Sequence, residues 1–459
     1  MSTTMVQEQV LVERKQCPHL EPRFAALKQS LVAKENKEKV IASYDRLCKI
    51  LEKEAALIDK VGPAIIPEID FSVVQENNGS LPDGLVNEVR DRGCVIIRNV
   101  VPEEQAVAWE TELKEYTKKY RSVGGFPEDN PQNWSLWWTR PQVQIRSHPR
   151  VVEVMKAINK LWHVSDPTLP VDLDTQVVYP DRFRIRYPSK EQEYTLNAHL
   201  DSGSIERWED ANYRKNYQKI FEGEWSSHDS WCADHRLDAD MNIYGAEANC
   251  SCWRSMQGWL SLSHSNTGDG TLRLLPSLKL STAYIMLRPL FIDAENDDGT
   301  YDDTQPTFPG AFPSNTQFFP TTDFHPHLRM EKSLIGIPPV RPGDYVFWHC
   351  DLIHEVDKFH PGKNDSSVVY YPCTPLTPYN LTSLVGVREA FEKADPPRDF
   401  RDLVHEKESA HEGHGARKEN ILCEEGLRGM GFLRFDERES GLTEGQRAIR
   451  KMANEALGL

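Results

Sequence analysis

The chain has 459 residues, with 54 Lys and Arg against 70 Asp and Glu, which gives a formal net charge of −16. This acidic balance disfavours nucleic acid as a partner, because binding a phosphate backbone requires a basic face. No apolar run approaches the roughly 20 residues that a membrane-spanning helix needs, so we expect no contact with a membrane.

Helical periodicity dominates residues 1–60. Apolar residues recur every three to four positions between Ile41 and Leu57, and Gly62 ends the pattern. We therefore expect an N-terminal helical extension. Residues 61–380 are predicted to form the main domain.

Three elements open that domain. A strand is predicted at 65–71, and a stronger one at 92–101, where β-branched residues follow one another. A helix is predicted from Pro102 to about Tyr120, because a proline and two acidic residues occupy its first turn.

Residues 182–187 alternate basic and apolar side chains. A strand over this segment would place Arg182, Arg184 and Arg186 on one face. Such a face is usually solvated, but this strand leads directly into the most informative motif of the chain.

That motif is the segment 196–201, which is predicted to be a short strand ending in His-x-Asp. Because side chains alternate along a strand, His199 and Asp201 leave the same face and can hold one metal ion. A further His would complete the two-His, one-carboxylate site that is typical of non-haem Fe(II) oxygenases. Taken alone, the tripeptide also fits a surface strand end, so its interpretation depends on a second segment.

Two strands are predicted downstream, at 258–263 and 271–275, and the Gly-rich turn between them suggests a hairpin. Trp259 on the first strand is expected to wall a cavity. Insertions near 205–250 and 290–335 interrupt the domain and are expected to be lids or binding loops, because long irregular stretches in a compact domain usually have that role.

The second motif follows a Pro-Gly-Asp turn. A buried strand is predicted from Tyr345 to Trp348, and Trp348 would also wall the cavity. His349 and His354 come next. Their odd spacing would place them on opposite faces of an extended chain, so only one of them is expected to bind the ion.

Together these features resemble the Fe(II)/2-oxoglutarate-dependent dioxygenases, in particular the phytanoyl-CoA hydroxylase and clavaminate-synthase-like branches. More narrowly, residues 199–208, 257–259 and 348–354 resemble the family known as domain of unknown function 1479. The resemblance spans roughly residues 60–390. It implies a mainly β fold with α, in which a double-stranded β-helix (jelly-roll) core carries N-terminal and C-terminal helical extensions.

The resemblance also implies a ligand set. In the superfamily the last ligand follows two apolar residues, which maps onto His354, so Fe(II) would be bound by His199, Asp201 and His354. His349 is then expected to be a core residue or a support for the site. The co-substrates would be 2-oxoglutarate and O2.

The anchor for 2-oxoglutarate departs from the superfamily pattern. Relatives usually carry Arg or Lys on the strand after the distal His, where it pairs with the C5 carboxylate. Here that strand, 366–373, has no basic residue. Arg184, Arg254 and Arg273 are the remaining candidates, and Asn197 shares the face of His199 and could orient a ligand or a carboxylate.

The function expected from this resemblance is oxidation of a small carboxylate-bearing metabolite, possibly an amino acid, with release of succinate and CO2. Hydroxylation, desaturation and ring closure all fit. One alternative is a cupin-like metal enzyme that does not use 2-oxoglutarate, which the missing basic residue favours. The other is a non-catalytic binding protein on the same barrel.

The tail, 381–459, is polar and charged, and it is predicted to be helical and to pack on the core, with a final amphipathic helix at 444–457. Nine irregularly spaced cysteines argue against a disulfide scaffold, and the N-terminus lacks a basic-then-apolar leader. Both observations favour a cytoplasmic location. The sequence does not define an oligomeric state.

Overall fold

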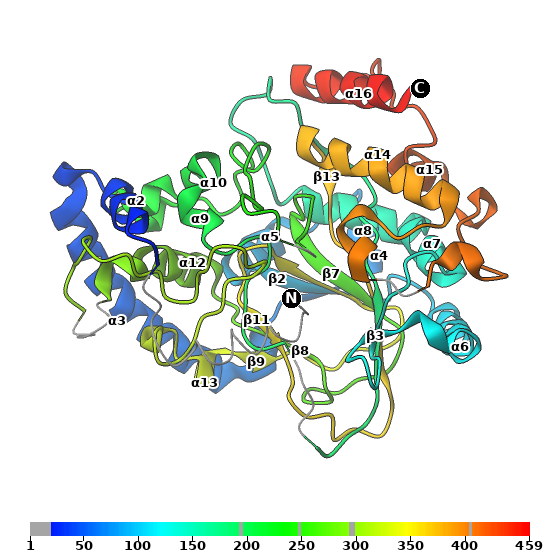
Figure 1. Cartoon of the computed structure of the whole chain (residues 1–459), viewed down its shortest axis with the longest axis horizontal. Helices are drawn as coiled ribbons and strands as arrows, with labels where there is room; N and C mark the ends of the chain where they lie inside the picture. Colours follow the sequence, from blue (N-terminus) through cyan, green and yellow to red (C-terminus); the bar gives the residue numbers. More distant parts are fainter. Residues whose placement is uncertain (1–19, 192–195, 247–248, 293–298, 404–405) are drawn as a thin grey trace.

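An eight-stranded sheet occupies the centre of the molecule (Figure 1). The computed structural model describes residues 20–191, 196–246, 249–292, 299–403 and 406–459. In sheet order the strands are β1 (Glu68–Asp70), β2 (Cys94–Arg98), β10 (Tyr345–His349), β7 (Met256–Ser261), β12 (Ser366–Tyr370), β6 (Phe183–Arg186), β4 (Asn133–Trp134) and β3 (Gly125–Phe126). Neighbouring strands are antiparallel, apart from the parallel pair β1 and β2.

A smaller sheet contains β11 (His354–Val356), β8 (Leu272–Leu274) and β9 (Ile335–Gly336), which are also antiparallel. Isolated bridges extend it, since His199 pairs with His354 and Leu200 pairs with Phe318. A third pair joins β5 (Asp172–Gln176) to β13 (Pro375–Leu376). The cavity described below is lined by residues of both larger sheets.

The central strands follow from local sequence. β2, β10 and β12 fall within or next to the strands predicted at 92–101, 345–348 and 366–373, and every residue of β10 is buried. Runs of Val, Ile, Tyr, Phe and Trp suit a strand that is covered on both faces.

The predicted hairpin at 258–275 is wrong. β7 lies in the eight-stranded sheet, whereas β8 lies in the three-stranded sheet, so the segment between them carries the chain from one sheet to the other. Gly270 makes this crossing with φ +71°, and a Cβ there would lie 2.9 Å from the ring of His360. The Gly-rich link therefore allows two segments of the chain to approach each other closely, and it does not form a tight hairpin turn.

Helices surround the sheets, and the chain is a mixed α/β protein with more helix than the mainly β expectation. The helices of the N-terminal half are α2 (Arg23–Leu31), α3 (Lys37–Val61), α4 (Phe71–Glu76), α5 (Asp83–Arg92), α6 (Glu103–Lys119), α7 (Arg140–Arg146), α8 (Pro149–Asn159), α9 (Glu206–Glu209), α10 (Ala211–Lys215) and α11 (Gln218–Phe221). They are followed by α12 (Leu278–Leu287), α13 (Met330–Ser333), α14 (Pro378–Lys393), α15 (Glu424–Gly429) and α16 (Glu444–Leu457). Among the described residues, none of these helices has both the length and the apolarity to cross a bilayer.

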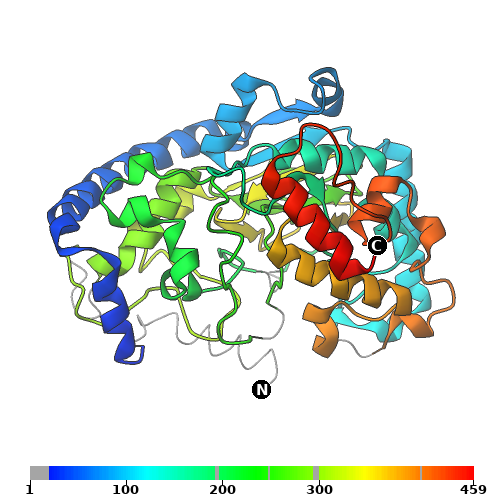
Figure 2. The same cartoon turned by 90° about the horizontal axis from the view of Figure 1, so that it is seen from above.

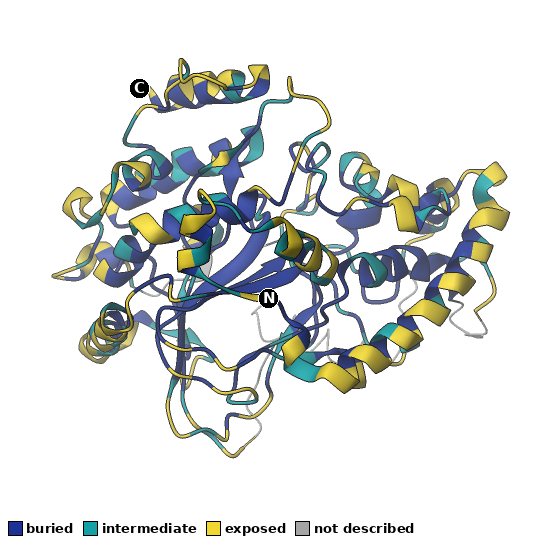
Figure 3. Cartoon of the chain, turned by 180° about the vertical axis from the view of Figure 1, so that it is seen from behind, coloured by how far each residue is buried: buried dark blue, intermediate teal, exposed yellow. Residues whose placement is uncertain are grey.

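The expected N-terminal helix is present as α3, while residues 1–19 lie outside the described part. The face of α3 that carries Val40, Leu47 and Ile58 is buried against α12 and α13. Its other face is exposed, as the yellow outer side of this helix shows in Figure 3. Apolar residues at helical spacing therefore predicted the helix, although Leu57, at the end of that pattern, is 42% exposed.

The tail forms a small apolar cluster of its own. Leu381 and Leu384 of α14 pack with Ile449 and Leu457 of α16 and with Leu376 of β13. Figure 2 shows α16 lying across α14, at the opposite end of the molecule from α3. The helix predicted at 444–457 is present with those bounds, and Thr443 caps it.

Candidate metal centre and its cavity

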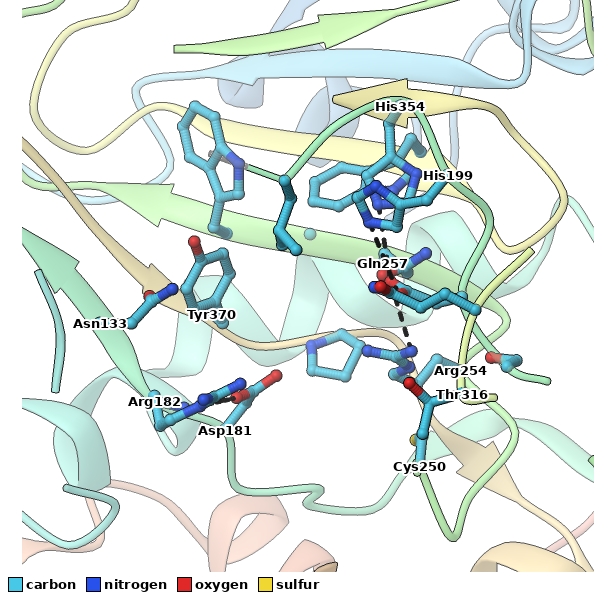
Figure 4. A pocket seen from close by; sticks show the side chains of 18 of the residues that line it. Asn133, Asp181, Arg182, His199, Cys250, Arg254, Gln257, Thr316, His354 and Tyr370 are labelled. Atoms are coloured by element: carbon cyan, nitrogen blue, oxygen red, sulfur yellow. Dashed lines mark hydrogen bonds and ion pairs between the residues drawn. The ribbon is translucent and has the colours of Figure 1, made fainter. Parts of the chain in front are cut away.

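Three side chains from two distant segments of the chain converge beside the three-stranded sheet, and Figure 4 shows two of them, His199 and His354. His199 and His354 exchange backbone hydrogen bonds of 2.9 and 3.1 Å, which places their imidazoles side by side. One carboxylate oxygen of Asp201 lies 3.6 Å from Nε2 of His199, and the other lies 3.5 Å from Nε2 of His354. One ligand atom from each residue lies within 4.8 Å of the others, as a mononuclear metal site requires.

Both imidazoles are oriented by backbone carbonyls. Nδ1 of His199 lies 2.6 Å from the carbonyl oxygen of Asn197, and Nδ1 of His354 lies 3.0 Å from that of Leu352. A proton on Nδ1 leaves Nε2 with a free lone pair, which is the tautomer that ligates a metal. The carbonyl of Asn197, and not the side chain that the sequence suggested, therefore orients the ligand.

The electrostatics suit a metal-binding carboxylate and a neutral imidazole. Burial lowers the pKa of His199 to about 4, and the neighbouring His354 acts in the same direction. Burial alone would raise the pKa of Asp201, but the neighbouring imidazoles of His354 and His199 and the guanidinium of Arg254 hold this pKa well below its usual range. Near neutral pH neither His199 nor Asp201 needs to lose a proton before a cation binds.

Two further side chains contact the carboxylate of Asp201. Gln317 donates a hydrogen bond from Nε2 to Oδ1 over 2.7 Å, and Nη2 of Arg254 lies 3.6 Å from Oδ2. Gln317 comes from the second insertion and Arg254 from the residues just before β7. These contacts fix the carboxylate between the two imidazoles.

His349 lies away from this cluster. Its Nε2 is 3.0 Å from the carbonyl oxygen of Ser230, and its Nδ1 accepts a hydrogen bond of 3.0 Å from the backbone N–H of Asp351. Its ring also stacks on Trp162 with centroids 4.8 Å apart. Both ring nitrogens are engaged, so His349 has no free lone pair for a metal.

A cavity of about 180 Å³ opens from the three converging residues. Trp259 of β7 and Trp348 of β10 line it, as the sequence predicted. Gln257 shares the face of Trp259 and also lines it, and alternation along the strand could have identified it. Gln317 lines it as well, and no signal in the sequence pointed to that residue.

The predicted anchors differ in position. Arg184 and Arg254 line the cavity, Arg184 buried and Arg254 partly buried, and Nε of each has no hydrogen-bond partner among the described residues. Arg273 is not among the lining residues. Its Nε lies 2.9 Å from Glu355 on the neighbouring strand β11. Of the three arginines, only the first two can contact a ligand in this cavity.

A charge pair lies across the cavity from the imidazoles (Figure 4). Oδ1 of Asp181 accepts a hydrogen bond of 2.7 Å from the backbone N–H of Arg182 and lies 3.4 Å from its Nε. The guanidinium of Arg182 sits over the ring of Phe400, 5.0 Å from its centroid. The wall therefore offers a cation and an anion side by side.

The two insertions contribute differently to the site. The first is folded into short helices with buried aromatic residues, and only Asn249 and Cys250 near its end line the cavity. The second supplies Thr316 and Gln317. The first insertion thus lies mainly against the core, which differs from the expected lid.

The fold and the site define a mixed α/β protein with a candidate metal centre next to a buried cavity. The chain belongs to the Gig2-like family, whose model matches residues 18–432. The predicted membership of domain of unknown function 1479 is thereby confirmed, since a solved relative carries both names.

That relative is GlcNAc Inducible Gene 2, GIG2 (DUF1479), from Candida albicans, which is 41% identical with a TM-score of 0.87 over 96% of each chain. A candidate oxidoreductase from Salmonella typhimurium LT2 is 28% identical with a TM-score of 0.76, over 91% of this chain and 99% of that one. YbiU of Escherichia coli K12, described as uncharacterized, is 30% identical over 352 residues, which are 74% of this chain and 80% of YbiU.

Proposed function

We propose that this chain is a non-haem Fe(II)/2-oxoglutarate-dependent oxygenase that acts on a small carboxylate-bearing metabolite, with an amino acid as the favoured substrate. The observation that carries the proposal is the convergence of His199, Asp201 and His354 within 4.8 Å. In this proposal the eight-stranded and three-stranded sheets form the two walls of a double-stranded β-helix. The Salmonella relative, named as a candidate oxidoreductase, supports the class of reaction.

The donor set fits iron. Two imidazole nitrogens and one carboxylate on the same side of an ion leave its other positions open for co-substrates. Asn197 and Leu352 hold the two imidazoles through their carbonyls, while Gln317 holds the carboxylate. The chain therefore positions all three ligands before a cation arrives.

Arg184 is the residue that we propose for the C5 carboxylate of 2-oxoglutarate. It lies on β6 directly beside Val368 of β12, the strand on which relatives of the superfamily carry their basic residue. Residues paired in this way point to the same face of the sheet. The guanidinium contacts the carbonyl oxygen of Gly270 at 3.3 Å, and its Nε keeps a donor free within the described part of the chain. A planar guanidinium with spare donors suits a carboxylate.

Arg254 is proposed to hold a second carboxylate close to the metal ligands. Its side chain is 12% exposed and lies 3.6 Å from Asp201, and its Nε lacks a hydrogen-bond partner within the described ranges. A largely buried cation next to one shared carboxylate favours the entry of a further anion. This charge supports a carboxylate-bearing substrate.

The cavity wall opposite the imidazoles favours an amino acid as the substrate. Asp181 and Arg182 present an anion and a cation together, which complements an ammonium and a carboxylate on one carbon. Trp259 and Trp348 supply apolar surface for an aliphatic side chain. A cavity of about 180 Å³ suits a small molecule.

With iron and 2-oxoglutarate bound, the site would supply O2-dependent decarboxylation to succinate and CO2, coupled to oxidation of a C–H bond. The chain would orient the substrate carbon and exclude water from it, and Trp259 and Trp348 suit this role because they are buried. Hydroxylation, desaturation and ring closure all follow from the same site, according to which carbon it presents.

Anaerobic titration with Fe(II) and 2-oxoglutarate tests the proposal. The expected result is a weak visible charge-transfer band that appears only when both are present, followed by succinate release when O2 is admitted. Metal binding without the band or succinate would favour a cupin-like enzyme. Binding of neither would favour a non-catalytic protein.

A further inference from the structure

The two sequence motifs meet a second time, away from the metal ligands. Arg207 follows Asp201 in the first motif, and Asp351 precedes His354 in the second. Nη1 of Arg207 lies 2.7 Å from Oδ1 of Asp351, and their side chains are only 1% and 2% exposed. A fully buried ion pair joins residues that the metal site itself does not use.

Arg207 also holds the chain at the metal-ligating carboxylate. Its Nη2 donates a hydrogen bond to the backbone carbonyl of Asp201. Tyr213, whose ring lies 5.3 Å from the same guanidinium, donates a hydrogen bond of 3.1 Å to the carbonyl of Ser202. One guanidinium therefore contacts both segments that carry metal ligands.

Asp351 has polar partners at both of its carboxylate oxygens and at its backbone N–H. Its Oδ1 accepts a hydrogen bond of 3.0 Å from the hydroxyl of Tyr217, and its Oδ2 pairs with Nη2 of Arg236 at 2.5 Å. Its backbone N–H donates to Nδ1 of His349. Two arginines share one buried carboxylate, so removing that charge leaves two cations uncompensated.

The backbone that follows Asp201 has an unfavourable conformation, which neighbouring side chains must hold in place. Directly after Asp201 the chain turns through Ser202 with φ +67° and Gly203 with φ +88°. A non-glycine residue in the left-handed region persists only where its surroundings fix it. Arg207 and Tyr213 provide that fixation through the carbonyls of Asp201 and Ser202.

We propose that Arg207 and Asp351 are positioning residues that set the separation of the Asp201 carboxylate and the His354 imidazole. The ion pair thereby sets the affinity of the site for a divalent cation. Metal sites depend on groups behind their ligands in this way, and losing such a group typically weakens metal binding by about 10- to 100-fold. This inference rests on the proposed metal site.

Titration of the full-length protein with Co(II), followed by visible absorption, tests it. Arg207→Lys and Asp351→Asn are expected to raise the Co(II) dissociation constant by about 10- to 100-fold and to change the absorption spectrum of the bound ion. Arg236→Lys is expected to have a smaller effect, because Arg236 contacts Asp351 but neither ligand-bearing carbonyl in the described hydrogen bonds.

Arg450→Lys is the matched control. Arg450 of the tail helix α16 forms a buried pair with Asp172 of β5 at 2.7 Å, away from the cavity. Circular dichroism would establish that each variant is folded at the temperature of the titration. The control is expected to keep the wild-type dissociation constant and spectrum.

Two results would be decisive against the idea. Folded Arg207→Lys and Asp351→Asn proteins with wild-type Co(II) affinity and spectrum would overturn the positioning role. A wild-type protein that fails to bind Co(II), or whose affinity survives His199→Ala, would instead overturn the proposed metal site on which this inference rests.

Discussion

Arg184 on β6 and Val368 on β12 are direct partners in the eight-stranded sheet. The side chain of Arg184 reaches the cavity from β6, which pairs with β12. Under the proposed function, β12 is the strand expected to carry the basic residue that binds 2-oxoglutarate, and Arg184 would take that role from the neighbouring strand.

This relationship predicts that Arg184→Gln raises the KM for 2-oxoglutarate by at least about tenfold, since a charge-assisted pair contributes about 1.5–3 kcal/mol. Succinate formation at increasing 2-oxoglutarate measures the effect. Arg273→Gln is the control, because Arg273 pairs with Glu355 outside the cavity. Equal effects of the two substitutions would contradict the assignment of Arg184.

The ligand set is tested by removing each side chain. His199→Ala, Asp201→Ala and His354→Ala should abolish tight iron binding, because each removes one of three donors. His349→Ala should retain iron, since its ring nitrogens are bonded to Ser230 and Asp351. Iron content after dialysis gives the answer. Loss of iron in His349→Ala together with its retention in His354→Ala would reverse the ligand assignment.

Burial of His349 predicts a loss of stability in acid. Burial lowers the pKa of this imidazole to about 3, so the native state binds no proton at a pH where the unfolded chain does. The free energy of unfolding should therefore fall as the pH drops below about 6.5, by about 2 kcal/mol between pH 7 and pH 5 for one such histidine. Urea denaturation at the two pH values measures it. His349→Gln should show a smaller difference, and an unchanged one would exclude His349 as the source.

The proposed substrate class predicts which compounds stimulate succinate formation. Aliphatic amino acids should stimulate it more than the matching carboxylic acids or amines, because Asp181 and Arg182 offer both charges. Asp181→Asn and Arg182→Gln should each raise the KM for the amino acid while leaving slow turnover without substrate in place. Stimulation confined to nucleic acid, peptides or long-chain acyl-CoA would refute the class.

Local patterns predicted the elements that local forces form. The strand at Cys94–Arg98, the strand at Tyr345–His349 and the helix at Glu103–Lys119 all follow from runs of β-branched residues or from a first-turn signal. The convergence of His199 with His354 was expected only through resemblance to a family. No periodicity connects the two segments.

Features that depend on contacts between residues far apart in the sequence could not be predicted from it. The link through Gly270 was predicted to be a hairpin turn. A glycine is needed there because the ring of His360 lies close to it, and His360 is far away in the sequence. Gln317 reaches Asp201 from an insertion without a regular pattern. The arginines at 182–187 suggested a solvated face, yet Arg184 and Arg186 are buried, because the sheet folds that face inward.

The backbone hydrogen bonds between His199 and His354 have a consequence for biosynthesis. On the ribosome the first motif emerges long before the second, so a nascent chain at first holds only two of the three proposed ligands. The ion pair between Arg207 and Asp351 can form only after Asp351 has been synthesised. The cation-binding pocket is therefore assembled only after translation has passed β11. Under the proposed function, iron would be loaded late in the life of the polypeptide, and a prematurely terminated chain that ends before β11 would be unable to retain the ion.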